Sequence, residues 1–253
     1  VQEVTEEIVL KMATHVRKVT KQKYLCLAGG VALNCVANGK LLRSEIFDDI
    51  FIQPAAGDAG GALGCAYIAW YQHLENKRTA DGKTDFMNGS YLGPEFSNQQ
   101  IKSYLDENNY EYKKLSNEEL PEKIADLINE QNVIGWFQGR MEFGPRALGA
   151  RTIIGDSRSA ETQKTINLKI KYRESFRPFA PSVLIEHVSD YFELDVESPY
   201  MLQVASVKKD RRIVMTDREQ NFFGIEKLKV PRSDVPAITH VDYSARVQTV
   251  SKE

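Results

Sequence analysis

"LAGGVALNCVANGKLL" (residues 27–42) indicates the fold class of this chain. An apolar run (24–28) meets two adjacent glycines, Gly29 and Gly30, and a segment of small residues with helical spacing follows. "PAAGDAGGALGCA" (54–66) repeats the arrangement after a second apolar run. Strand, glycine turn and helix, twice in succession, are typical of an α/β layer.

Length and composition bound the class of protein. The chain has 253 residues, enough for one large domain or two modest ones, and its 42% hydrophobic and 27% charged residues are typical of a globular protein. A net charge of −2 gives no general attraction to nucleic acid or anionic membrane. Neither a membrane-length apolar run nor a signal peptide is visible, and three cysteines without a C-x-x-C pair are typical of reduced thiols. We therefore expect a cytoplasmic protein.

Periodicity predicts the order of the secondary structure. Helices are expected at 3–20, 31–43, 58–74, 97–108, 117–131, 160–172 and 186–192. Strands are expected at 24–28, 49–54, 110–115, 133–138, 181–185, 200–207 and near 245–250. Residues 75–96 are polar with scattered Gly and Pro, which favours a linker or a surface excursion.

Positive charge is concentrated in one segment. Residues 139–180 hold nine basic and four acidic residues, a local charge of +5, and the rest of the chain carries −7. In "GRMEFGPRALGAR" (139–151), Arg140, Arg146 and Arg151 surround glycines that let a backbone approach a ligand. "KYRESFRPFAP" (171–181) adds Lys171, Arg173 and Arg177. Arginine's planar fork matches phosphate or carboxylate oxygens, so an anion pocket is slightly favoured over structural salt bridges with Glu142, Glu174 or Asp156.

The glycine turns allow two interpretations each. Free amides at the start of a helix after Gly29 and Gly30 favour a phosphate or polar nucleotide, and tight strand–helix packing is about equally compatible. Asp58 precedes the second helix and is either a plain N-cap or a lone carboxylate ligand for a metal or a hydroxyl. The sequence does not choose between them.

Together with "NLKIKYRESFRPFAPSV" (167–183) and "ITHVDYSARVQTV" (238–250), these stretches resemble the ATP-dependent O-carbamoyltransferases of the nodulation-protein and antibiotic-tailoring type. The resemblance implies an α/β chain with part of an actin-like (ASKHA) ATPase domain at 1–80, a linker or crossing segment at 81–96, and a YrdC-like α+β domain with a mixed sheet at 97–253. It implies that carbamoyl phosphate and ATP form carbamoyl-adenylate, whose carbamoyl group passes to a hydroxyl of a small-molecule acceptor with the help of a metal such as iron. Nucleic acid and membrane are not expected as partners.

The resemblance also implies roles for single residues. The catalytic positions are Arg146, Lys171 and Arg177. Arg140, Arg151 and Arg246 are substrate- or nucleotide-binding positions, and Gly29, Gly30 and Asn34 line the nucleotide side. Asp58 matches the metal-binding carboxylate.

The family's metal-binding histidines, its first phosphate loops and its terminal serine and asparagine are not matched in this chain. We therefore expect a fragment of a longer enzyme, inactive alone and without a complete metal site. Two alternatives remain: a phosphotransferase of the actin-like class, and a non-catalytic nucleotide- or RNA-binding module.

Overall fold

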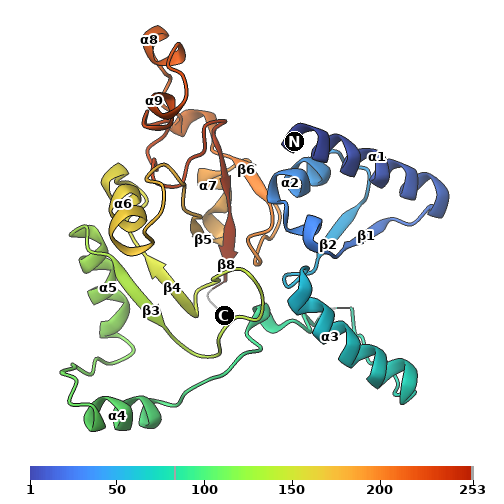
Figure 1. The fold of residues 1–253 in the computed structure, drawn as a ribbon, viewed down its shortest axis with the longest axis horizontal. Coiled ribbons are helices and arrows are strands. Elements are labelled where there is room, and N and C mark those ends of the chain that lie inside the picture. The colour runs from blue at the N-terminus through green and yellow to red at the C-terminus, as the bar shows by residue number, and fades with distance from the viewer. Residues whose placement is uncertain (83, 252–253) are drawn as a thin grey trace.

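A computed structural model describes residues 1–82 and 84–251 as a mixed α/β arrangement (Figure 1). The helices are α1 (Gln2–Thr20), α2 (Cys35–Arg43), α3 (Asp58–Ile68), α4 (Asn98–Glu107), α5 (Glu119–Asn129), α6 (Ala160–Thr165), α7 (Val188–Tyr191), α8 (Asp217–Gln220) and α9 (Ile225–Leu228). The π-helical turns η2 (Ala69–His73) and η4 (Ile166–Ile170) extend α3 and α6. Short 3-10 turns are η1 (Gly30–Leu33), η3 (Asn88–Ser90), η5 (Ile185–His187) and η6 (Lys209–Arg211).

The strands pair two by two. They are β1 (Tyr24–Leu27), β2 (Asp49–Ile52), β3 (Ile134–Phe137), β4 (Arg151–Ile154), β5 (Ser182–Leu184), β6 (Val204–Ser206), β7 (Ser244–Arg246) and β8 (Gln248–Val250). β1–β2 and β5–β8 are parallel, whereas β3–β4 and β6–β7 are antiparallel. Both strand directions occur, as expected, but the described strands form separate pairs and not the single mixed sheet that the sequence suggested.

Three elements differ from expectation. The expected strand 110–115 is absent, because Tyr110 instead stacks on Tyr104 of α4, with ring centroids 6.2 Å apart. β1 is only half buried, with the side chain of Tyr24 70% exposed. The helix at 31–43 is interrupted, since η1 ends at Leu33 and α2 begins at Cys35, with Asn34 between them.

The expected amphipathic helix forms as α1, but its apolar stripe does not face the core. Val4, Ile8 and Met12 are exposed, and the helix contacts α2 mainly through Ala13 and its neighbours. Helical periodicity thus located the helix correctly and its buried face incorrectly.

The helix α2 ties the N-terminal part of the chain to the C-terminal part. The buried amide of Asn38 donates to the carbonyls of Ala32 (2.8 Å) and Leu202 (2.9 Å). Nearby, Arg43 donates to the carbonyl of Val204 on β6, at 2.9 Å. Figure 1 shows α2 beside β6 accordingly. Any cavity near the start of α2 is therefore shared by both parts.

The contact between α2 and β6 depends on a glycine. A Cβ on Gly39 would lie 2.5 Å from the carbonyl oxygen of Val204, so Gly39→Ala should lower the free energy of unfolding by about 1–3 kcal/mol. The matched control is Gly64→Ala in the interior of α3, where a Cβ would meet no atom within 4 Å. That change should raise stability by about 0.5–1 kcal/mol, because alanine favours helix. Thermal unfolding of both variants checks the prediction, and equal effects would contradict it.

The polar stretch 75–96 has two halves. Residues 77–82 are irregular, whereas Met87 and Ser90 are buried and Ser90 Oγ donates to the carbonyl of Phe143 at 2.7 Å. The second half therefore packs against the loop that carries Arg146, and the boundary expected at 81–96 stays a prediction. Within the described residues, helices long and apolar enough to cross a membrane are absent.

Candidate functional site

A buried carboxylate organises the loop that follows β3. Glu142 Oε1 accepts hydrogen bonds from the backbone amides of Leu148 (2.7 Å), Ala150 (2.8 Å) and Arg151 (3.3 Å). Burial alone raises the pKa of Glu142, but these amides outweigh burial and lower it, so the carboxylate is ionised. Glu142 therefore fixes the loop from inside and does not form the salt bridge with an arginine that was the alternative.

Two glycines complete the same loop. Gly144 and Gly149 have φ angles of 142° and 114°, which side-chain-bearing residues rarely adopt. A Cβ on Gly144 would also lie 3.1 Å from the carbonyl oxygen of Pro54, so the loop contacts the second glycine turn of the N-terminal part. This geometry places Arg146 between the two parts of the chain.

Arg146 and Arg246 are the least satisfied cations of the cavity. Arg146 Nη2 donates to the carbonyl of Leu33 at 3.2 Å, but the Nε atoms of both arginines are buried without a partner among the described residues. The pKa of Arg246 is lowered, first by burial and then by the like charge of Arg146. Two half-buried like charges with buried, unused Nε donors favour a bound anion.

The two arginines line a cavity of about 900 Å³, which the side chains of Lys171, Arg173 and Arg177 also reach. The expected convergence of Arg146, Lys171, Arg177 and Arg246 is thus found. The cavity was expected within the C-terminal domain, but Cys35 at the start of α2 also lines it. The N-terminus of α2 adds the partial positive charge of its free amides to this wall.

Arg177 forms an ion pair with Glu174, which was the alternative to an anion-binding role. Its Nε lies 2.8 Å from Glu174 Oε2, and both side chains are about half exposed. An exposed pair of this kind contributes little, so a ligand can displace it. The side chain of Lys171 is exposed at the cavity rim.

Arg140 and Arg151 are placed differently from the other arginines. Arg140 lies outside the cavity lining, with Nε 3.6 Å from Glu95 and Nη1 donating to the carbonyl of Gly93. Arg151 lines the cavity, but it donates to the carbonyls of Gln138 and Gly139, among others, and its guanidinium stacks 3.5 Å from the Phe137 ring centroid. These contacts hold β3, β4 and the loop together and leave Arg151 few donors for a ligand.

Arg158, another basic residue of the segment 139–180, forms a structural salt bridge with Asp156. Its side chain and Gln131 donate to the buried carboxylate of Asp156, with Arg158 Nη2 2.8 Å from Oδ2. The Arg158 guanidinium is the main cause that lowers the pKa of Asp156 to about 2.

This shift predicts how stability depends on pH. Because the folded pKa of Asp156 lies below the usual value of 3.8, its contribution is present above about pH 4 and is lost as pH falls through 2. Asp156→Asn should therefore lower the free energy of unfolding at pH 7 and flatten its dependence on pH between 4 and 2. Denaturant titrations at several pH values check this, with the exposed Asp195→Asn as control. A slope unchanged by Asp156→Asn would contradict the prediction.

The first glycine turn does not line the cavity, whereas Cys35, which follows it at the start of α2, does. A Cβ on Gly29 or Gly30 would meet no atom within 4 Å, and only Gly29, with φ 92°, requires glycine. Asn34 caps α2 by accepting from the amide of Ala37 at 3.1 Å, and its amide group also pairs with Gln2. The turn is therefore open, whereas the Asn34 side chain is engaged.

Asp58 does not lie in a formed metal site. It is the first residue of α3, exposed, and the N-cap position is taken by Gly57. Across residues 1–82 and 84–251, groups of three or more His, Cys, Asp or Glu side chains able to hold a metal ion are absent. A single carboxylate is a weak site, so the described residues do not fit a catalytic metal.

Two cavity residues were missed as site candidates: Cys35 and His240. Arg173, expected beside Lys171 and Arg177 in an anion pocket, does line the cavity; it is half-buried, with Nε donating to Asn167 Oδ1 at 2.6 Å. His240 carried no comparable signal, because a turn separates it from β7.

Comparison with known proteins finds relatives over the whole length of this chain. The carbamoyltransferase N-terminus family matches residues 1–67, and the carbamoyltransferase C-terminus family matches residues 125–253. Nodulation protein NolO of Bradyrhizobium diazoefficiens is 41% identical over 256 residues, which cover 100% of this chain and 42% of NolO. The 3'-hydroxymethylcephem-O-carbamoyltransferase of Streptomyces clavuligerus is 31% identical, over 93% of this chain and 38% of that enzyme. An uncharacterized Synechocystis protein is 58% identical over 100% of this chain and 41% of its own length. The chain thus spans about two fifths of the length of these curated relatives.

Proposed function

The chain belongs to the carbamoyltransferase family, and from this premise we propose that its arginine cavity binds carbamoyl phosphate and ATP to form carbamoyl-adenylate. The carbamoyl group would then pass to a hydroxyl of a small-molecule acceptor. The observation that carries the proposal is the pair of buried, unpartnered Nε atoms of Arg146 and Arg246 in one cavity. Such donors cost free energy unless an anion accepts from them.

The cations of the cavity would contact different phosphate groups. Arg146 and Arg246, whose Nε atoms are buried, would hold phosphate oxygens through fixed donors, which stabilise the charge that develops during transfer. Lys171 and Arg177 lie at the rim and would neutralise the outer phosphates of ATP. The open turn at Gly29 and Gly30 lies toward the start of α2, on the side where a nucleotide could extend.

The acceptor is proposed from a relative. The name of the cephem enzyme states carbamoyl transfer to the oxygen of a hydroxymethyl group. We propose the same class of acceptor, a small-molecule alcohol, for the protein to which this chain belongs. The domain assignment proposed with it is an actin-like part at 1–80 and a YrdC-like part at 97–253. Because Asp58 has no companion ligands among the described residues, no step is assigned to a metal.

Calorimetry tests the proposal. The chain should bind carbamoyl phosphate and ATP, and a short RNA should bind more weakly than either at physiological salt. Arg140→Ala, outside the cavity, should leave both affinities unchanged. Binding of ATP without carbamoyl phosphate would favour the actin-like phosphotransferase, and tighter binding of RNA would favour the nucleic-acid module. Either result overturns the proposal.

A further inference from the structure

His240 stands at the edge of the arginine cavity in a defined orientation. Its backbone amide donates to the carbonyl of Ser244 at 2.8 Å, which closes a turn leading into β7. Its ring Nδ1 lies 3.0 Å from Ser244 Oγ. Ser244 and Arg246 are two residues apart on β7 and therefore share a face, so the imidazole is held beside the Arg246 side chain.

The hydrogen bonds around Ser244 determine the tautomer of His240. Ser244 Oγ lies 2.7 Å from Asp242 Oδ1, and a carboxylate only accepts, so the serine hydroxyl donates to Asp242. Its single hydrogen is then used, and the contact with His240 requires that Nδ1–H donates to Ser244 Oγ. Burial lowers the pKa of His240, with a further lowering by Arg246 against an opposing effect of Asp242, so the ring is neutral. Nε2 is left as an acceptor.

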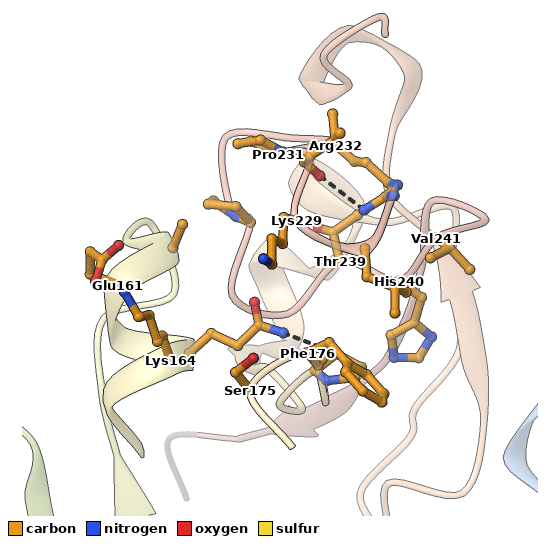
Figure 2. Close-up of a pocket in the computed structure, with 16 residues that line it drawn as sticks. Glu161, Lys164, Ser175, Phe176, Lys229, Pro231, Arg232, Thr239, His240 and Val241 are labelled. Atoms are coloured by element: carbon orange, nitrogen blue, oxygen red, sulfur yellow. Dashed lines mark hydrogen bonds and ion pairs between the residues drawn. The ribbon is translucent and has the colours of Figure 1, made fainter. Parts of the chain in front are cut away.

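The Nε2 acceptor is unused and accessible. It makes no hydrogen bond to any described residue, and it is not among the buried unpartnered atoms, so it opens onto space. The ring borders two hollows, the arginine cavity and a neighbouring one of about 470 Å³ (Figure 2). Figure 2 shows His240 at the opposite end of the second hollow from Glu161 and Lys164, which pair with each other at 3.6 Å. Unpaired cations border both hollows: Arg146 and Arg246 line the arginine cavity, and Arg232, whose Nε is also buried without a partner among the described residues, lines the second hollow.

Few of the side chains that line the arginine cavity can accept a hydrogen bond. The guanidinium groups and the Lys171 ammonium only donate. Among the side chains that line this cavity in the described part of the chain, only Thr152 and His240 offer an oxygen or nitrogen acceptor. A ligand that carries a donor as well as anionic oxygens would therefore find only these two side-chain acceptors among the described residues of the cavity, besides backbone carbonyls.

Carbamoyl phosphate is such a ligand, and this step rests on the function proposed above. Its phosphate and carbonyl oxygens accept hydrogen bonds, whereas its NH₂ group can only donate. We propose that His240 Nε2 accepts a hydrogen bond from the carbamoyl NH₂ and thereby selects carbamoyl phosphate over acyl phosphates. Acetyl phosphate has a methyl group at that place, which would leave Nε2 without a donor.

A pair of substitutions separates the two ring nitrogens. His240→Asn keeps a donor near the position of Nδ1, for Ser244, and removes the acceptor at Nε2. His240→Gln places an amide oxygen near the position of Nε2. Thr152→Val is the matched control for the other acceptor. Calorimetry of the chain with carbamoyl phosphate, acetyl phosphate and inorganic phosphate, beside thermal unfolding, measures affinity and folding of each variant.

The wild type should bind carbamoyl phosphate about tenfold more tightly than acetyl phosphate. His240→Asn should bring this ratio of affinities to about one, with the affinity for inorganic phosphate unchanged. His240→Gln and Thr152→Val should largely retain the wild-type ratio. A wild type that does not discriminate, an unchanged ratio in His240→Asn, or loss of the ratio in Thr152→Val would overturn the inference and leave the proposed function standing. Absence of any binding of carbamoyl phosphate to the wild type would overturn both.

Discussion

Arg246→Ala should weaken the binding of carbamoyl phosphate about ten- to a hundredfold and leave the thermal stability of the chain unchanged or slightly higher. In the free protein, Arg246 is half-buried close to the like charge of Arg146, and its buried Nε has no partner among the described residues. Its removal relieves desolvation and repulsion, so stability should not fall. In the complex, one charge-assisted hydrogen bond to phosphate is lost, worth about 1.5–3 kcal/mol. Arg146→Ala should behave alike, apart from its contact with Leu33.

Arg151→Ala is the control for this result. Arg151 lines the same cavity, but its guanidinium donates to backbone carbonyls and stacks on Phe137. Its loss should lower the melting temperature, whereas the affinity per folded molecule should survive. Calorimetry and thermal unfolding of the variants, measured together, separate the two kinds of arginine. If Arg246→Ala lowers stability as much as Arg151→Ala and retains affinity, the cavity cations are structural.

The sequence was most informative where residue chemistry and spacing act together. The glycines around Arg146 predicted a constrained loop, and the structure shows Gly144 and Gly149 at positive φ with Arg146 held between them. The arginine-rich segments also predicted a shared cavity, which is found. Local patterns of this kind depend on backbone sterics and charge, which do not need distant contacts.

The contacts that each residue makes in the folded chain could not be predicted from such local patterns. Sequence reasoning treated the arginines of one loop alike, yet Arg140 binds Glu95 at the surface and Arg151 binds carbonyls. It also placed the cavity inside one domain, because nothing local shows that α2 packs on β6 and brings Cys35 to the wall. His240 was not singled out, because its place at the cavity depends on where the pairing of β6 with β7 positions this part of the chain. These features depend on contacts between residues far apart in the chain.

Glu142→Ala should be the most destabilising single change near the site. The carboxylate is 8% exposed and accepts from three backbone amides, so alanine leaves three buried donors without a partner. We expect a loss of about 3–4 kcal/mol in the free energy of unfolding, or roughly 10 °C in melting temperature. Glu161→Ala, at an exposed carboxylate 3.6 Å from Lys164, is the matched control and should change stability by less than about 0.5 kcal/mol.

Glu142→Gln separates the geometry of the loop from its charge. The amide oxygen of glutamine can still accept from Leu148 and Ala150, so the loop should keep its shape, with a smaller loss of about 1–2 kcal/mol from weaker, uncharged hydrogen bonds. Because Arg146 depends on this loop, carbamoyl phosphate affinity should fall in Glu142→Ala and be largely retained in Glu142→Gln. A Glu142→Ala variant with wild-type stability would show that the loop is held by Gly144, Gly149 and the hydrogen bonds to the Leu148 carbonyl from Tyr91 and Gln248 alone. Equal loss of affinity in both variants, with the loop intact, would instead indicate that the negative charge of Glu142 itself acts on the ligand.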